Sequence, residues 1–280
     1  MSFQAPKTLT ITTVVLYIIA LFSIVLTSKF LAYENLLQNI SKENGFFESV
    51  SVFLLLTIVF IGIKTLIQEK NIFEKWILIG IAVFTILAFL AAMEEISWGQ
   101  HLFNFESSEY FKTQNLQGET NLHNLMNANL FSSILYASIY ILLVFIPLFV
   151  KLIPSFKERF VLFQYFDISL HTILVLLFAS VFQIYFYDDF GVWFDMLAHL
   201  SALLLFGIYL FMTRSSIWLK LHYAFIVLAT CISMLSYEIY RFENMQYEIR
   251  ETFVVLAVLL IFMELIWQEK NNVKNLMKKK

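Results

Sequence analysis

The chain has 280 residues, of which 60% are hydrophobic and only 14% are charged, and its formal net charge is −2. Soluble domains carry roughly a quarter charged residues, so this composition excludes an ordinary soluble domain. The slightly acidic balance excludes a nucleic-acid-binding protein, and the single cysteine, Cys231, excludes an intramolecular disulfide.

The hydrophobic residues come in runs of about 20, the length of a helix that crosses a bilayer core of about 30 Å. The sequence therefore predicts an all-α, polytopic membrane bundle of about eight transmembrane helices, in one integral membrane domain over residues 1–280. The expected spans are 8–28, 47–67, 75–95, 128–150, 167–187, 192–212, 219–239 and 250–268.

Lysine and arginine lie mainly before the first span, in every second connection after it, and in the tail. Basic residues gather on the cytoplasmic side of membrane proteins. Both the N-terminus and the C-terminus are therefore predicted to be cytoplasmic, in a multi-pass protein of the cell (cytoplasmic or inner) membrane. The basic tail, residues 269–280, is expected to contact the anionic inner leaflet. On the same side, Asp167 is expected to cap the fifth span; the alternative is a pair with His171, one helical turn later.

Carboxylates follow the opposite distribution, and several lie at span ends on the outer side. Charge at a membrane boundary is costly unless it is paired or lines a wet cavity. Five span ends carry such groups: Glu48; Glu94, Glu95, Ser97 and His101; Asp195 and His199; Glu238 and Arg241; Arg250 and Glu251. Because all of them lie at one depth, we expect them to form a single outward-facing polar pocket.

Spacing suggests roles for the residues of this pocket. If the third helix continues to residue 101, Glu94, Ser97 and His101 share one face. The alternative is that Gly99 ends the helix first, which would break this alignment. Asp195 lies one helical turn before His199, so its carboxylate can orient the imidazole ring. The predicted catalytic residues are Glu94, Glu95, Ser97 and Asp195, with Glu94 or Glu95 as general base.

The connection at 96–127 is long, polar and aromatic, which is typical of an amphipathic lid at the membrane interface. Thr120 or Asn121 can cap the incoming fourth span. The polar residues of this loop and of neighbouring span ends are the predicted substrate-binding set: Glu48, Gln100, Glu119, Asn121, Asn124, Glu238 and Arg241.

Three of the five histidines, His101, His123 and His199, fall on the outer side. Three histidines with a carboxylate are a sufficient ligand set for a divalent metal such as zinc, so these are the predicted metal ligands. The spacing matches no established metal-binding motif. The alternative is a hydrogen-bonded network that closes the outer end of the bundle.

The stretches "EEISWGQHLFNFES" (94–107) and "NLQGETNLHNL" (115–125) resemble segments of a family of bacterial multi-pass membrane proteins. That resemblance implies a membrane fold and no particular activity. More distantly, Ser97 and His101 resemble the Ser-x3-His element of alkaline ceramidase-like membrane hydrolases, which bind zinc. That resemblance implies hydrolytic chemistry, although Asp195 and His199 stand where that superfamily has a histidine pair.

These patterns favour an integral membrane enzyme that hydrolyses or transfers a lipid or lipid-linked substrate with help from a metal or a carboxylate. The alternative is a non-catalytic membrane scaffold or assembly partner. A transporter is less favoured, because span cores such as 13–26 and 77–92 are almost wholly apolar. The expected partners are membrane lipids and no nucleic acid.

Overall fold

In this computed structural model the described residues are 45–115, 118–122, 125, 128–159, 161–183, 190–236 and 243–277. Over these residues the chain is helical and has no β-strand. Four of the described helical segments are long and apolar enough to cross a membrane, namely Phe46–Gln68, Lys75–Glu95, Ile134–Leu152 and Ile217–Leu235. Two further apolar helical segments, Leu170–Phe182 and Met196–Met212, are shorter.

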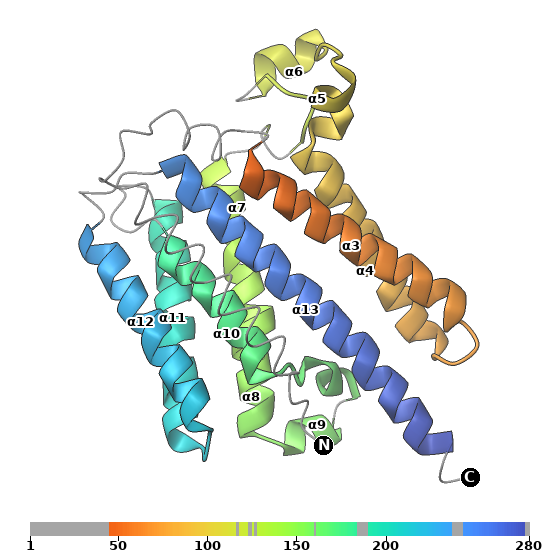
Figure 1. Cartoon of the computed structure of the whole chain (residues 1–280), viewed down its shortest axis with the longest axis vertical. Helices are drawn as coiled ribbons and strands as arrows, with labels where there is room; N and C mark the ends of the chain where they lie inside the picture. Colours follow the sequence, from red (N-terminus) through yellow and green to blue (C-terminus); the bar gives the residue numbers. More distant parts are fainter. Residues whose placement is uncertain are drawn as a thin grey trace. The chain divides into compact units, whose positions relative to one another are not determined.

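The described residues fall into two compact units, both built of helices (Figure 1). The described residues within Met1–Phe47 and Ser132–Ala257 form the first unit, and those within Glu48–Phe131 and Val258–Lys280 form the second. Helix α13 (Glu243–Met277) is continuous and contributes its first part to the first unit and its last part to the second.

The second unit is built on the long helices α3 (Phe46–Gln68) and α4 (Lys75–Glu95). They touch at Gly62, where an added Cβ would lie 1.9 Å from the Thr85 hydroxyl oxygen. Thr85 donates that hydroxyl to the Ile81 carbonyl at 2.7 Å, so its polar group is satisfied inside its own helix. On another face of α4, Phe84 stacks on Phe262 of α13 with ring centroids 4.9 Å apart.

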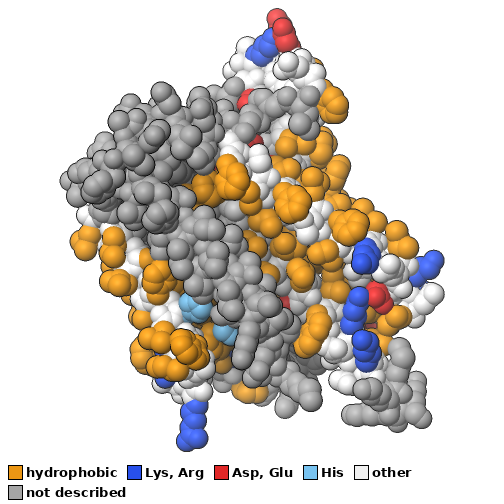
Figure 2. Space-filling view, viewed as in Figure 1, with side chains coloured by type: hydrophobic (Ala, Val, Ile, Leu, Met, Phe, Trp, Pro, Cys, Tyr) orange, Lys and Arg blue, Asp and Glu red, His pale blue; other side chains and the backbone are white. Residues whose placement is uncertain are grey.

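Apolar side chains are exposed along this helix pair on the face that Figure 2 shows. The exposed large residues on α3 and α4 include Phe53, Phe60, Ile67, Ile79, Ile86 and Leu87. Beyond α4 the chain forms a small cap, made of the turn η1 (Ser97–Gly99) and the short helices α5 (Gln100–Phe103) and α6 (Glu109–Gln114).

The first unit contains, from Ser132 onward, most of one long helical stretch, made of α7 (Ala128–Tyr140), the π-helical segment η3 (Ile141–Phe145) and α8 (Ile146–Leu152). The π-helical segment comes just before Pro147, which lacks an N–H and cannot donate to the preceding turn. The short elements α9 (Ser155–Arg159) and η4 (Val161–Phe166) follow.

The core of the first unit is α10 (Leu170–Phe178) and the 3-10 turn η5 (Ala179–Phe182), which are almost completely buried. Around them lie α11 (Phe190–Met212), α12 (Ile217–Ser236) and the first part of α13. Phe182 stacks on Phe253 of α13 with ring centroids 5.8 Å apart. Ser180 and Thr230 form a buried hydroxyl pair at 3.0 Å, so the apolar core contains a satisfied polar contact.

Predicted spans and described helices coincide closely where both exist. The four long apolar helices lie at the predicted spans 47–67, 75–95, 128–150 and 219–239. The predicted first span, 8–28, lies outside the described residues. The predicted fifth span, 167–187, is helical from 170 to 182, and Gln183 then adopts an extended backbone. The total of eight spans stays a prediction.

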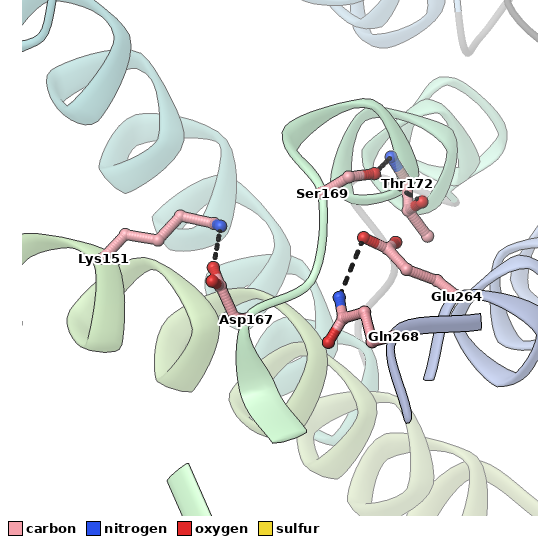
Figure 3. A network of polar contacts seen from close by, with 6 residues as sticks. All are labelled: Lys151, Asp167, Ser169, Thr172, Glu264 and Gln268. Atoms are coloured by element: carbon pink, nitrogen blue, oxygen red, sulfur yellow. Dashed lines mark hydrogen bonds and ion pairs between the residues drawn. The ribbon is translucent and has the colours of Figure 1, made fainter. Parts of the chain in front are cut away.

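The N-cap predicted at the start of the fifth span was wrong. The Ser169 hydroxyl, not Asp167, accepts a hydrogen bond from the Thr172 amide at 3.2 Å and caps α10. Asp167 instead forms an ion pair with Lys151 (Figure 3). The helix begins two residues later than an Asp167 cap would require, and the carboxylate lies outside it and pairs with Lys151 of α8. Figure 3 also shows Gln268 donating to Glu264 one turn earlier on α13, at 3.4 Å.

Candidate functional site

The chain leaves α4 through three consecutive residues in the left-handed region, Ser97 (φ 45°), Trp98 (φ 54°) and Gly99 (φ 83°). This backbone is natural for glycine, but each non-glycine residue held there costs about 1–3 kcal/mol. The helix therefore ends at Glu95, and the expected alignment of Glu94, Ser97 and His101 on one continuous helical face is wrong. The turn redirects Ser97, which is 0% exposed.

The Glu94 carboxylate bridges the turn and the following loop. Its Oε1 accepts a hydrogen bond from the Trp98 indole at 2.6 Å, and its Oε2 accepts one from the Leu122 backbone amide at 2.6 Å. Hydrogen bonds to an ionised carboxylate are roughly twice as strong as neutral ones. Glu94 thus fastens residue 122 to the end of α4. Glu95, the last residue of α4, is half-buried.

Ser97 lies at the centre of the site. Its hydroxyl donates to Oε2 of Glu119, 22 positions later in the chain. The Asn121 amide donates to the Ser97 hydroxyl oxygen at 3.2 Å and to the same Glu119 oxygen at 3.3 Å. Ser97 and Asn121 are both buried, so a hydroxyl, a carboxylate and an amide meet away from bulk water.

A second set of contacts supports the centre. Gln100 Oε1 accepts from the Ser107 hydroxyl at 3.1 Å and from the Thr120 amide at 2.8 Å. The Asn115 amide donates to the carbonyl and the side-chain oxygen of Asn121 at 2.9 and 2.8 Å. We call the whole set the helix-end cluster; it consists of Glu94, Ser97, Gln100, Ser107, Asn115, Glu119, Thr120 and Asn121.

The helix-end cluster joins the two stretches that sequence analysis singled out, residues 94–107 and 115–125. Thr120 and Asn121 do not cap the next helix, because α7 begins at Ala128 and both residues bond back to the cluster. Sequence reasoning missed Ser107 and Asn115, which carry no distinguishing pattern. Their role depends on Gly118 (φ 70°), which turns the loop back on itself.

The rim of the cap carries an exposed ion pair. Lys112 Nζ lies 2.6 Å from Glu106 Oε2. The hydrogen bond and the positive charge of Lys112 hold the pKa of Glu106 below its ordinary value. The same cap exposes large aromatic side chains, Phe103 and Tyr110 most of all, beside polar residues. This mixture suits the headgroup region of a membrane.

A separate polar centre lies in the first unit. Arg250, 2% exposed, stacks its guanidinium 3.8 Å from the centre of the Tyr136 ring and donates to Gln183 Oε1. The Tyr136 hydroxyl donates to Glu251 Oε1 at 3.1 Å. We call Tyr136, Tyr140, Gln183, His199, Arg250 and Glu251 the arginine centre, since His199 packs on Tyr140, one turn along α7 from Tyr136.

The other predicted site residues fall in different places. Glu48 is half-buried in the first turn of α3. Asp195 lies on α11 and His101 on α5, but their side chains lie outside what the structure describes. His123, Asn124, Glu238 and Arg241 lie outside the described residues altogether. The helix-end cluster and the arginine centre belong to different units, so the single shared pocket stays a prediction.

Metal binding through His101, His123 and His199 also stays a prediction. Within the part of the chain that the structure describes, no three His, Cys, Asp or Glu side chains gather as a ligand set. Of the three histidines, only His199 has a described side chain.

Comparison with protein-family models, with curated proteins and with solved structures finds no match for this chain.

Proposed function

We propose that this chain is a multi-pass protein of the cell membrane, with both ends in the cytoplasm, that hydrolyses or transfers a lipid or lipid-linked substrate at its outer face. The helix-end cluster is the reacting centre in this proposal. The observation that carries it is the hydrogen bond from the buried Ser97 hydroxyl to the Glu119 carboxylate, at a turn of left-handed residues. Backbone strain of this kind is concentrated at functional sites.

The chemistry follows from the direction of that hydrogen bond. Ser97 Oγ attacks the carbonyl or phosphoryl centre of the substrate while Glu119 takes the hydroxyl proton. Glu119 then gives this proton to the departing oxygen of the leaving group. Attack by water, or by a second alcohol, on the covalent intermediate releases the product and restores Ser97. Asn121, which already donates to the Ser97 oxygen, stabilises the developing negative charge.

Access to Ser97 requires movement of the loop, because the serine is buried. Residues 119–122 cover it through the bonds from Asn121 to Ser97 and from Leu122 to Glu94. In the proposal this loop is a lid that opens to admit a substrate from the headgroup region. Glu94 is then the residue that fastens the lid, rather than the general base expected from sequence.

The experiment is turnover of labelled membrane lipids by the purified chain in liposomes. Ser97→Ala and Glu119→Gln should each reduce turnover by a factor of 100 or more, in the range expected for loss of a nucleophile or a base. Thr113→Ala is the matched control, because Thr113 is an exposed cap residue that bonds only to carbonyls of its own helix. Full turnover by Ser97→Ala would refute the proposal.

A second candidate is a non-catalytic scaffold, and one observation favours it. Both oxygens of Glu94 are occupied by protein donors, so this part of the cluster resembles a structural clasp. A scaffold predicts no lipid turnover by the wild-type chain and a loss of cap stability in Ser97→Ala. The same liposome assay, read with thermal unfolding, therefore separates the two functions.

A further inference from the structure

The arginine centre contains a buried histidine whose hydrogen-bonding groups need a partner. His199 is 0% exposed, and among the described residues neither of its ring nitrogens has a hydrogen-bond partner. A neutral imidazole carries one donor and one acceptor. A buried polar group that has lost water and gained no partner destabilises the folded state. A side chain in this position is therefore suited to bind a polar group that enters the protein.

Side chains from α11 and α13 pack on neighbouring rings of α7. The His199 ring of α11 lies edge-on to Tyr140, with centroids 4.5 Å apart. Arg250 of α13 reaches the same face of α7. Tyr136, one turn before Tyr140, stacks under the Arg250 guanidinium. The imidazole, from α11, and the guanidinium are thus held in one region by rings on a common face of α7.

The charge of Arg250 decides which ligands fit. A guanidinium is always protonated and repels a metal cation bound to a neighbouring imidazole. It attracts an oxyanion, which accepts hydrogen bonds from both guanidinium and imidazole donors. Gln183 and Tyr136 fix the guanidinium in place, so its orientation need not be established when the ligand binds.

We propose that the arginine centre binds a phosphate group through His199 and Arg250, as a site distinct from the helix-end cluster and independent of the reaction proposed there. His199 donates a ring N–H to one phosphate oxygen and Arg250 donates to another. The phosphate belongs either to a lipid headgroup or to free inorganic phosphate. Phosphate is favoured over a carboxylate because its oxygens point in several directions, which matches donors that come from two helices.

The test uses the full chain in detergent micelles, with inorganic phosphate and phosphatidic acid as separate probes and a diacylglycerol, which has no phosphate, as the control lipid. Binding of all three is followed by the shift in thermal unfolding midpoint, and binding of the two phosphate probes also by phosphorus NMR linewidths. Wild-type protein should bind at least one of the two phosphate probes more tightly than the diacylglycerol. Binding of phosphatidic acid alone identifies a lipid ligand, and binding of both probes identifies the phosphate group itself.

His199→Phe should weaken this binding by about ten- to a hundredfold, the loss expected for one hydrogen bond to a charged group. His222→Phe is the matched control, because it makes the same change at a histidine on α12. Equal binding by His199→Phe and wild type would overturn the proposal. The absence of phosphate binding by the wild-type protein would also overturn the proposal. That result does not depend on whether any variant folds. Lipid turnover is measured separately. A negative result for phosphate binding therefore does not decide whether the helix-end cluster catalyses the proposed reaction.

Discussion

The Ser97 hydroxyl donates a hydrogen bond to the Glu119 carboxylate, and this contact joins the end of a long apolar helix to a loop 22 residues further on. Around it, Asn121 and Gln100 tie the same loop to the same turn. Left-handed residues at 97 and 98 are unfavourable in isolation. Their conformation is stable only because these long-range contacts offset the strain, so the cap should lose structure when the contacts are removed.

Replacing Glu94 by alanine should destabilise the cap by about 1–3 kcal/mol, the sum of two net hydrogen bonds of about 0.5–1.5 kcal/mol each. The change leaves the Trp98 indole and the Leu122 amide without their shared carboxylate, and because both contacts are exposed, water replaces part of what is lost. Hydrogen exchange at the Leu122 amide measures the effect directly. Glu109→Ala is the control, since Glu109 lies on the exposed face of α6. If the Leu122 amide were equally protected from hydrogen exchange in Glu94→Ala and wild type, Glu94 would not be what holds residue 122 at the end of α4.

Replacing Gly62 by alanine should separate α3 from α4. The new Cβ would lie 1.9 Å from the Thr85 hydroxyl oxygen and 3.0 Å from its Cβ, so one helix must shift. Overpacking of this kind costs about 1–3 kcal/mol. The thermal unfolding midpoint should fall in Gly62→Ala and recover in the double variant with Thr85→Gly.

Gly80→Ala provides the matched control for this experiment. Gly80 lies on α4, and an added Cβ there would meet nothing within 4 Å. Its unfolding midpoint should stay constant or rise, because alanine is the better helix former. If Gly62→Ala and Gly80→Ala lowered the unfolding midpoint equally, the close approach of α3 to α4 would not be the reason for a glycine at position 62.

Glu269, near the end of α13, should make the protein less stable as the pH rises. Burial, together with the negative charge of Glu74, raises the pKa of Glu269 above its ordinary value, although a hydrogen bond from Asn272 opposes the shift. A raised carboxyl pKa means that the folded state binds its proton more tightly than the unfolded state. The stabilisation is full below the unfolded-state pKa and disappears as the pH rises through the folded-state pKa.

Glu269→Gln should remove this pH dependence and raise the unfolding midpoint at neutral pH. Chemical denaturation across the acidic range, in wild type and variant, provides the comparison. Parallel stability curves for the two proteins would mean that Glu269 titrates normally.

Glu106 should show the opposite shift. Lys112 lowers its pKa, so its small contribution to cap stability is present above the unfolded-state pKa and is lost as the pH falls through the folded-state pKa. Carbon NMR of labelled glutamate should find Glu106 titrating below its ordinary range in wild type and returning to that range in Lys112→Met. A titration that is the same in both proteins would contradict the ion pair.

The amino-acid sequence by itself determined where the long apolar helices lie. The predicted segment 47–67 corresponds to α3 at Phe46–Gln68, and the predicted segment 75–95 has the bounds of α4. Agreement this close has a local cause, because an uninterrupted apolar run must satisfy its backbone hydrogen bonds within itself and a helix does so. The sequence also marked the two polar stretches that meet in the helix-end cluster.

Only the tertiary structure decided how the polar residues are used. Periodicity placed Ser97 on a helical face with Glu94, whereas a left-handed turn points it to Glu119. It also made Asp167 a cap, whereas an ion pair with Lys151 holds it. The cation–π contact between Arg250 and Tyr136 joins residues more than a hundred positions apart. Such contacts depend on which segments meet in space, and hydrophobic periodicity along one segment carries no information about that.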